Sequence, residues 1–213
     1  MNFNQFLESI SNIGDMPLPA EASQFKMSPP FRLELLKQQQ DKIKNAKQSA
    51  VLALFYPDTL YNTNLILILR KTYKGVHSAQ VGFPGGKVEE EDESLEHTAL
   101  RETEEEVGVP RKHVKVLKKM TQVYIPPSNF YVHPYIGVVN QTPNFIKEDS
   151  EVEALIEVPL SHFLDEQNVI TKTVSTSYKV NVEVPAFKLN DHVVWGATAM
   201  MLSEIKDLLK LYL

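Results

Sequence analysis

An acidic segment near the middle of the chain reads Arg101-Glu102-Thr103-Glu104-Glu105-Glu106-Val107-Gly108-Val109. Upstream of it, Ser94 is a typical N-cap residue, and residues 95–107 are mostly good helix formers. Gly108, followed by Pro110, is a regular stop signal. The sequence therefore predicts one helix over residues 95–107 that carries four closely spaced glutamates.

These glutamates do not share one face of the predicted helix. At about 100° per residue, Glu102 and Glu106 lie within about 20° of Leu95, at the edge of the apolar stripe, and Glu105 lies about 80° from Leu95. Glu104 points about 160° away from Glu102, toward solvent. Carboxylates crowded beside a buried face repel one another, and a hard cation such as Mg²⁺ offsets that repulsion. The alternative is an ordinary solvated acidic face.

Composition limits the classes of protein to which the chain can belong. Its 213 residues are 43% hydrophobic and 23% charged, which is typical of a globular protein with one core. A net charge of -5 without a basic block argues against nucleic acid as a partner. The longest clean apolar run, residues 65–69, is far too short to span a membrane. With no cysteine and no basic signal segment at the N-terminus, we expect a cytoplasmic protein.

Hydrophobic patterning outlines the other elements. We expect an N-terminal helical annex over residues 1–45, including a helix over residues 2–12, followed by a domain over residues 46–213. Pro84-Gly85-Gly86 reads as a break that turns the backbone. Residues 151–158 fit a strand or a helix. We expect strands at residues 50–56, 64–71, 113–117, 121–125 and 131–139. A hairpin is expected over residues 169–184, and helices over residues 160–164 and 193–213. Strands around one central helix, with a second helix at the end, predict an α+β protein with an α/β/α sandwich.

Residues 86–109 resemble the Nudix box, G-x5-E-x7-R-E-U-x-E-E-x-G-U, in which U is a bulky apolar residue. Two positions depart from this pattern. Thr103 replaces an apolar residue, and Lys87 stands where the first glycine is expected, with Gly86 one residue earlier. A one-residue extension of the loop reconciles the spacing and leaves Asp92 and Glu93 competing for the first acidic position.

The segment before the box resembles the coenzyme A pyrophosphatases of the Nudix superfamily. It reads Leu69-Arg70-Lys71, then Gly75-Val76-His77-Ser78-Ala79-Gln80-Val81-Gly82-Phe83-Pro84-Gly85-Gly86. Later stretches are also similar to that subgroup, at Val158-Pro159-Leu160 and Val194-Trp195-Gly196-Ala197-Thr198-Ala199. This resemblance implies a Nudix-type sandwich with a mixed central sheet, the catalytic helix after a glycine-rich loop, and a C-terminal helix.

The resemblance also implies a reaction and a set of residues. Similar enzymes cleave a diphosphate by attack of water, assisted by Mg²⁺ or Mn²⁺. By analogy Glu102 and Glu106 are the core metal ligands, and a carbonyl near Gly86 completes the shell. Glu105 is then a ligand or a group that orients water, held by Arg101. By position, Glu151 or Glu153 is the candidate for the general base, and the alternative is that Asp149, Glu151 and Glu153 form a solvated loop.

For the substrate the resemblance implies a nucleoside diphosphate derivative. The leading expectation is hydrolysis of coenzyme A or acyl-CoA to 3',5'-ADP and a 4'-phosphopantetheine product. Arg70 is expected to meet a phosphate, with Gln80 and Phe83 beside the metal loop, whereas Trp195 is expected to anchor the C-terminal helix in the core. Alternatives are ADP-ribose, a nucleotide sugar or a nucleoside triphosphate as substrate, and a domain that binds a nucleotide or a partner protein without catalysis. A homodimer is left open.

Overall fold

The computed structural model describes residues 1–71, 80–175 and 181–213. Within these ranges the strands form an eight-stranded mixed sheet and a three-stranded antiparallel sheet. The strands are β1 (Lys47–Pro57), β2 (Thr63–Arg70), β3 (Val81–Gly82), β4 (Gly85–Lys87), β5 (Lys115–Lys119), β6 (Val123–Ile125), β7 (Phe130–Val138), β8 (Val152–Pro159), β9 (Val169–Val174), β10 (Val182–Leu189) and β11 (His192–Trp195). The α-helices are α1 (Phe3–Ser9), α2 (Ala20–Gln24), α3 (Arg32–Gln38), α4 (Gln40–Ile43), α5 (Leu95–Val107), α6 (Leu160–Leu164) and α7 (Gly196–Lys210). Short 3₁₀ helices occupy Ile13–Asp15, Phe25–Met27, Arg111–His113 and Glu166–Asn168.

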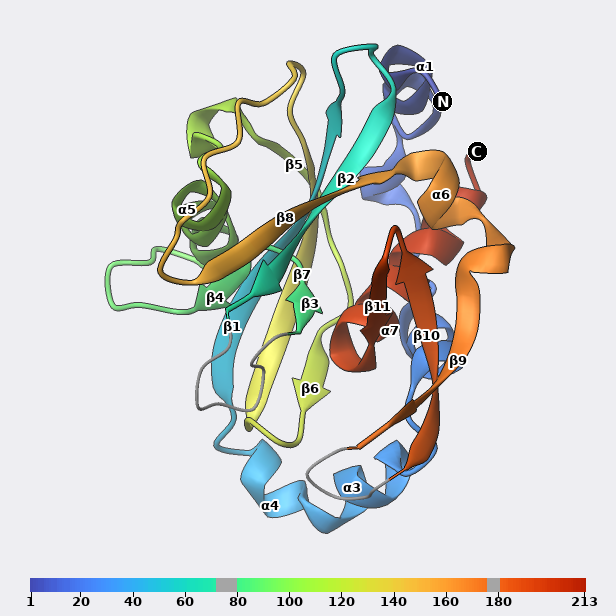
Figure 1. Ribbon diagram of the computed structural model, residues 1–213. Coiled ribbons are helices and arrows are strands. Elements are labelled where there is room, and N and C mark those ends of the chain that lie inside the picture. Colours follow the sequence, from blue (N-terminus) through green and yellow to red (C-terminus); the bar gives the residue numbers. More distant parts are fainter. Residues whose placement is uncertain (72–79, 176–180) are drawn as a thin grey trace.

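Strand β1 shows why the molecule has three layers. Its side chains alternate between the two faces of the sheet, and those on both faces are buried. Leu52 and Leu54 pack in the cluster that includes Ala99 of α5, whereas Ala53 and Phe55 pack in the cluster that includes α7. Helix α5 therefore covers one face of the large sheet, and α7 with the small sheet lies at the other (Figure 1). This is the predicted α/β/α sandwich with a mixed central sheet.

The glycine-rich segment turns the backbone as predicted, with a bend at Pro84, and Gly85 and Gly86 also belong to a short strand, β4, that was not predicted. Strand β2 pairs with β1 only near one end, and the two strands then separate. Beyond that point β3 pairs with β2, and β4 pairs with β1. Gly85 has a φ of 147°, and a Cβ there would collide with the carbonyl of Ala50, so glycine is required. The chain thus passes through the split in the sheet and brings Gly86 to the side of α5.

The remaining strands complete the large sheet. Strand β7 runs parallel to β1, and β5 and β6 pair with the outer edge of β7. Residues 151–158 fitted either a strand or a helix in the sequence, and the structure has a strand there, β8, which pairs antiparallel with β2. The hairpin expected over residues 169–184 is confirmed in the pairing of β9 with β10. Residues 75–79 of the upstream motif lie outside the described residues.

Helix α7 starts later than predicted and is buried more completely. Residues 192–195 form β11, which pairs with β10, so the helix begins at Gly196 rather than near residue 193. The expected stripe through Met201 and Ile205 is buried, but the opposite side of the helix is buried too. The N-terminal segment covers that side, since Glu204 accepts hydrogen bonds from the backbone N–H of Ala20 at 3.2 Å and from Nε2 of Gln24 at 2.8 Å.

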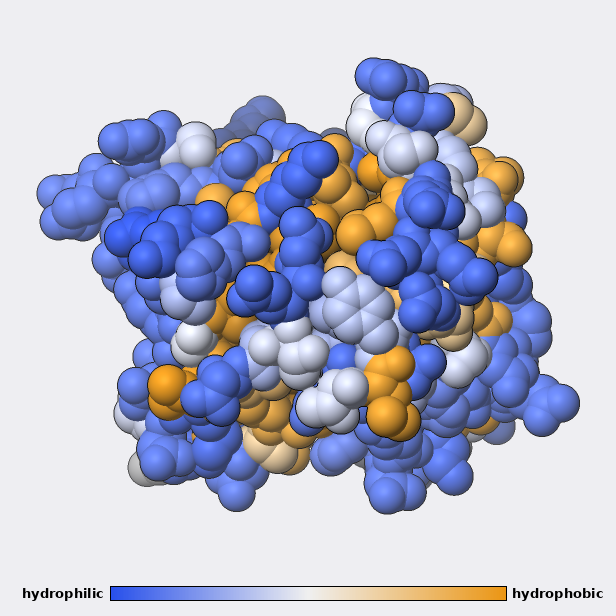
Figure 2. Space-filling model, turned by 90° about the horizontal axis from the view of Figure 1, so that it is seen from above, coloured by the Kyte–Doolittle hydropathy of each residue, from blue (hydrophilic) through white to orange (hydrophobic). Residues whose placement is uncertain are grey.

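The N-terminal segment packs on the same core as the rest of the chain. Phe3 and Phe6 of α1 are fully buried, and the ring of Phe6 lies 5.2 Å from that of Phe55 in β1. The backbone N–H of Phe3 donates to the carbonyl of Tyr61 in the β1–β2 turn at 2.9 Å. Figure 2 shows this end of the molecule, where hydrophilic side chains surround a central group of hydrophobic ones. Near the end of the expected helical annex, the chain forms two short helices, α3 and α4. A division of the chain between residues 45 and 46 stays a prediction.

Among the helices of the described ranges, none has the length and apolarity that crossing a membrane requires.

Candidate active site

Helix α5 has the predicted bounds, residues 95–107. The hydroxyl of Ser94 accepts a hydrogen bond from the backbone N–H of His97 at 3.1 Å, and Gly108 ends the helix with a φ of 73°. Thr103 occupies a fully buried position where an apolar residue is expected. Its hydroxyl donates to the carbonyl of Ala99 at 2.7 Å, so no polar atom is left unpaired there. The buried position therefore accommodates threonine without an unsatisfied polar group.

Glu106 is a buried carboxylate that faces the glycine-rich strands. It is 2% exposed and accepts hydrogen bonds from the backbone N–H of Gly85 at 2.7 Å and from Nη2 of Arg70 at 3.2 Å. Burial raises the pKa of Glu106 to about 7, although Arg70 and the Gly85 N–H oppose this. The nearby charges of Glu102 and Glu151 raise it further.

Glu102 lies one turn before Glu106 and touches the same strand. Its carboxylate is so close to Gly86 that a Cβ at that position would collide with it. Burial is again the main reason that the pKa of Glu102 is raised, and Glu151 adds to it. The structure therefore brings together Glu102, Glu106 and Gly86, and places Glu151 near enough for its charge to affect both carboxylates.

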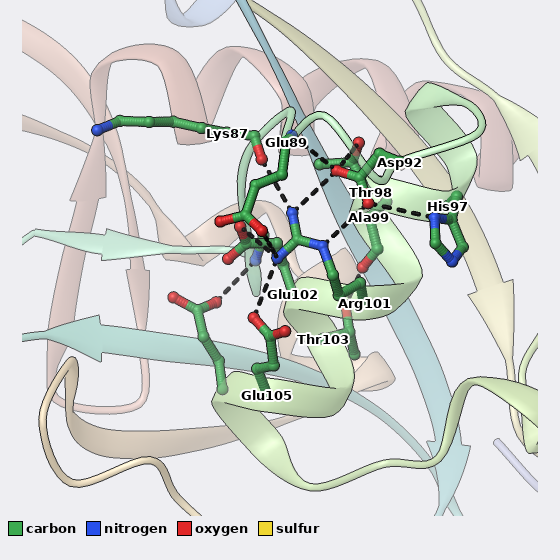
Figure 3. A network of polar contacts seen from close by, with 12 residues as sticks. Lys87, Glu89, Asp92, His97, Thr98, Ala99, Arg101, Glu102, Thr103 and Glu105 are labelled. Carbon is green, nitrogen blue, oxygen red and sulfur yellow. Dashed lines mark hydrogen bonds and ion pairs between the residues drawn. The ribbon is translucent and has the colours of Figure 1, made fainter.

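Arg101 is the centre of a network that ties the loop before α5 to the helix (Figure 3). Its Nε and Nη2 donate to the two oxygens of Asp92, both at 2.9 Å, and Nη2 also donates to the carbonyl of Lys87 at 3.1 Å. The Asp92 side chain is 0% exposed and also accepts from the hydroxyl of Thr98 at 2.8 Å. These hydrogen bonds hold the pKa of Asp92 well below its usual range. Asp92 thus pairs with Arg101, whereas Glu93 is exposed.

Glu105 and Glu104 lie differently from the helical-wheel expectation. Arg101 Nη1 is 3.1 Å from an oxygen of Glu105, as expected, but the Glu105 side chain is 55% exposed rather than at a buried seam. Glu104 is less exposed, at 39%, and pairs with Nε of Arg111 at 3.2 Å. The described residues contain no group of three or more His, Cys, Asp or Glu side chains arranged to hold a metal ion. Of the three expected carboxylates, Glu102 and Glu106 are therefore the two that are largely buried, whereas Glu105 is more exposed beside Arg101.

A cavity of about 660 Å³ lies beside the glycine-rich strands. It is lined by Ser49 and Val51 of β1, whose neighbours Ala50 and Leu52 pack toward α5, so it lies on the face of the sheet opposite α5. Arg70, Gln80 and Phe83 all line it, and Gly86 separates it from the carboxylates. The structure thus brings together the three residues that we expected at the substrate.

The comparisons with known proteins agree with this geometry. Residues 46–176 match the model of the NUDIX domain. The chain belongs to the Nudix family. It is 34% identical over 141 residues to proteins described as "Uncharacterized Nudix hydrolase NudL" from Yersinia pestis (strain Pestoides F) and Yersinia pseudotuberculosis serotype O:1b (strain IP 31758); the match covers 66% of this chain and 70% of each relative.

A solved structure shows the same fold. The MutT/nudix family protein from Enterococcus faecalis superposes with a TM-score of 0.50 and 19% identity, over 76% of this chain and 60% of that one. The family match and the Nudix hydrolase relatives, rather than this structure, support the assignment of the chain as a Nudix pyrophosphohydrolase, and Nudix hydrolases generally use divalent metal ions.

Several residues at this Nudix site were not expected from the sequence. Phe31, Arg32 and Leu35, from the N-terminal segment, form part of the cavity wall. Trp195 is only half-buried and also lines the cavity, which corrects the expectation that it anchors the core. The sequence signal for the N-terminal wall is weak, since it consists of one aromatic and one cationic residue after Pro29-Pro30 in a polar stretch.

Proposed function

We propose that this Nudix enzyme hydrolyses the diphosphate of coenzyme A or acyl-CoA to 3',5'-ADP and (acyl-)4'-phosphopantetheine. The observation that carries the proposal is the cavity beside Gly85 and Gly86. Its volume of about 660 Å³ is in the range of small-molecule sites, and many lining residues are apolar, including Phe31, Phe83 and Met201. Such a lining suits the pantetheine arm and an acyl chain better than the hydroxyl-rich second sugar of a nucleotide sugar. The upstream motif from Leu69 to Gly86 supports the same substrate.

The residues near Gly86 fit a hard divalent cation, Mg²⁺ or Mn²⁺. Glu102 and Glu106 offer carboxylate oxygens, and the lack of a side chain on Gly86 allows the Glu102 carboxylate to lie directly against β4. Mg²⁺ in enzymes is usually held by one or two carboxylates together with substrate phosphates, so a third acidic ligand is unnecessary. The raised pKa values of both carboxylates reflect buried negative charge that a cation would stabilise. When bound, such a cation neutralises charge on the diphosphate and makes water a better nucleophile.

The side chains around this site have separable roles in the proposal. Glu102 and Glu106 hold the cation, and the carbonyl of Gly86 adds a ligand. Arg70 lies between Glu106 and the cavity and binds a phosphate oxygen. Arg101 positions Glu105, which is a further ligand or orients water.

Glu151 is proposed as the general base. Its backbone carbonyl accepts from the N–H of Lys71 at 2.9 Å, which fixes the chain next to the end of β2. Its negative charge is close enough to raise the pKa of both Glu102 and Glu106, which supports a position near these carboxylates. In the reaction one water oxygen bonds to phosphorus as the anhydride P–O bond breaks, and Glu151 accepts the proton of that water.

The test is a substrate panel with identification of the products by mass. The purified protein is incubated with Mg²⁺ or Mn²⁺ and one of coenzyme A, acyl-CoA, ADP-ribose, a nucleotide sugar or a nucleoside triphosphate. We expect 3',5'-ADP from coenzyme A with the highest kcat/KM of the panel. Cleavage of ADP-ribose or another diphosphate with coenzyme A untouched would show that the substrate is the alternative one. Gel filtration of the same preparation tests for a homodimer, and fractionation of cells that produce the protein tests the expected cytoplasmic location.

A further inference from the structure

Part of the cavity wall comes from outside the region that matches the NUDIX model. That region starts at residue 46, whereas Pro29, Phe31, Arg32 and Leu35 belong to the N-terminal segment. Two arginines line the cavity in the described part of the chain, Arg70 and Arg32. Arg70 is paired with Glu106, which leaves the role of Arg32 to be explained.

Arg32 is a largely desolvated cation with hydrogen-bond donors left over. Its Nη2 donates to the carbonyl of Tyr124 in β6 at 2.8 Å. Its Nε is buried and has no hydrogen-bond partner among the described residues. Burial lowers the pKa of Arg32, and the more distant charge of Glu21 only partly opposes this. Since a desolvated charge without a hydrogen-bonded counter-ion is costly, an anion in the cavity that Arg32 lines would stabilise this guanidinium.

Arg32 and Arg70 approach the cavity from different sides. Arg70 Nη1 donates to the carbonyl of Gly85 in β4 at 3.4 Å, whereas Arg32 is bonded to β6. From β4 the sheet runs through β1 and β7 to β6. Three strand spacings separate β4 from β6, which is roughly 14 Å. The two guanidinium groups therefore serve different parts of one ligand rather than the same phosphate.

We propose that Arg32 binds a phosphate monoester of the substrate, distinct from the diphosphate that is cleaved. The two terminal nitrogens of the planar guanidinium can bind a phosphate with two parallel hydrogen bonds, because only one of their N–H groups, on Nη2, donates to a described residue, Tyr124. The inference rests on the proposed function, because in coenzyme A the group concerned is the 3'-phosphate. The enzyme then discriminates coenzyme A from its 3'-dephospho form through a residue of the N-terminal segment.

The competing explanation is structural. The bond from Arg32 to Tyr124 joins α3 to β6 and would matter for any substrate. Arg32→Lys keeps the charge but removes the fork of donors, and Arg32→Gln removes the charge. Arg111→Gln is the matched control, because Arg111 pairs with Glu104 on the exposed side of α5 and does not line the cavity.

The experiment measures kcat and KM of each variant on coenzyme A and on 3'-dephospho-CoA. We expect Arg32→Gln to raise KM for coenzyme A by at least about tenfold with little change in kcat, and to leave 3'-dephospho-CoA unaffected. Arg32→Lys should recover part of the loss, and Arg111→Gln should behave as wild type. Equal effects of Arg32→Gln on both substrates would overturn the inference and assign Arg32 a structural role.

A binding measurement separates this inference from the proposed function. Calorimetric titration compares 3',5'-ADP with AMP on the wild-type protein and on both Arg32 variants, without turnover. Tighter binding of 3',5'-ADP that is lost in Arg32→Gln supports the inference, even if coenzyme A is not cleaved. Equal affinities for the two nucleotides on the wild-type protein would contradict the inference, whether or not coenzyme A is a substrate. Thermal unfolding of each variant shows that the comparison is made on folded protein.

Discussion

Gly86 has no side chain, and this allows β4 to approach α5 closely. Because a Cβ on Gly86 would collide with the Glu102 carboxylate, we expect Gly86→Ala to displace that carboxylate. The expected loss in kcat is at least about tenfold, which corresponds to about 1.4 kcal/mol of lost transition-state stabilisation. Steady-state kinetics at saturating Mg²⁺ measures it.

Gly14→Ala is the control for this change. A Cβ on Gly14 would lie 3.5 Å from the carbonyl of Leu117, an ordinary contact far from α5. Its kinetics should match the wild type. If Gly86→Ala is as active as Gly14→Ala, the close approach of Gly86 to Glu102 has no part in catalysis.

Residue spacing alone predicted some of the site. Helical periodicity places Glu102 and Glu106 on one face and Glu104 on another, because the period of 3.6 residues is a property of the backbone. It could not predict that Glu105 is more exposed than Glu104, since that depends on Arg101 and Arg111, whose positions are set by other segments. Spacing also could not predict that Asp92, rather than Glu93, pairs with Arg101, because the path of the loop before α5 determines which side chain faces the arginine.

At the level of elements, the ion pair between Asp92 and Arg101 fixes the loop before α5. The Arg101 side chain is only 14% exposed, and Asp92→Asn replaces its charged partner with a neutral amide. We expect the free energy of unfolding at pH 7 to fall by about 3 kcal/mol, as for other buried pairs that lose one partner. Chemical denaturation measures the loss.

The pH dependence of this loss has a definite sign. The folded-state pKa of Asp92 is lowered, so its stabilising effect is complete above the unfolded pKa of about 3.9 and is lost as the pH falls below it. The difference between wild type and Asp92→Asn should therefore be constant above about pH 5 and shrink below about pH 4. A difference that stays the same down to pH 2 would show that the charge of Asp92 does not stabilise the fold.

Cap and stop residues predicted a helix correctly where the local sequence alone sets its ends. The cap at Ser94 and the stop at Gly108 gave the bounds of α5. The residues at 84–86 turn the backbone as predicted, but strand β4 was not predicted, because it forms only in the split between β1 and β2, a property of the sheet rather than of the segment. Residues 193–195 were assigned to the last helix for the same reason, since their pairing with β10 is not visible locally.

At the scale of the whole molecule, the N-terminal segment belongs to the core that supports the site. Phe6 is fully buried against Phe55 of β1. We expect Phe6→Ala to lower the free energy of unfolding by about 3–5 kcal/mol, as for other buried aromatic residues, in one cooperative transition. Leu33→Ala is the control, because Leu33 is 60% exposed and its loss should cost less than about 0.5 kcal/mol. A loss below about 1 kcal/mol for Phe6→Ala would mean that α1 contributes little to the core.

The cavity could not be predicted from the sequence, because its wall is assembled from distant segments. Arg32, Arg70 and Trp195 meet there only after the sheet has formed and the N-terminal segment has packed against α7. Motif spacing describes one helix and its loop, and it carries no information about which other segments surround them. The annex, whose role the sequence left open, supplies part of that wall.

The most direct measurement of the central claim compares Glu102→Gln with Glu104→Gln on coenzyme A at saturating Mg²⁺. The two residues are two positions apart on α5, but Glu102 touches Gly86 and Glu104 pairs with Arg111. We predict that Glu102→Gln lowers kcat by at least about a hundredfold, or about 2.7 kcal/mol, and that Glu104→Gln stays within about twofold of the wild type. Equal losses in the two variants, or no loss in either, would contradict the assignment of this face of α5 as the catalytic one.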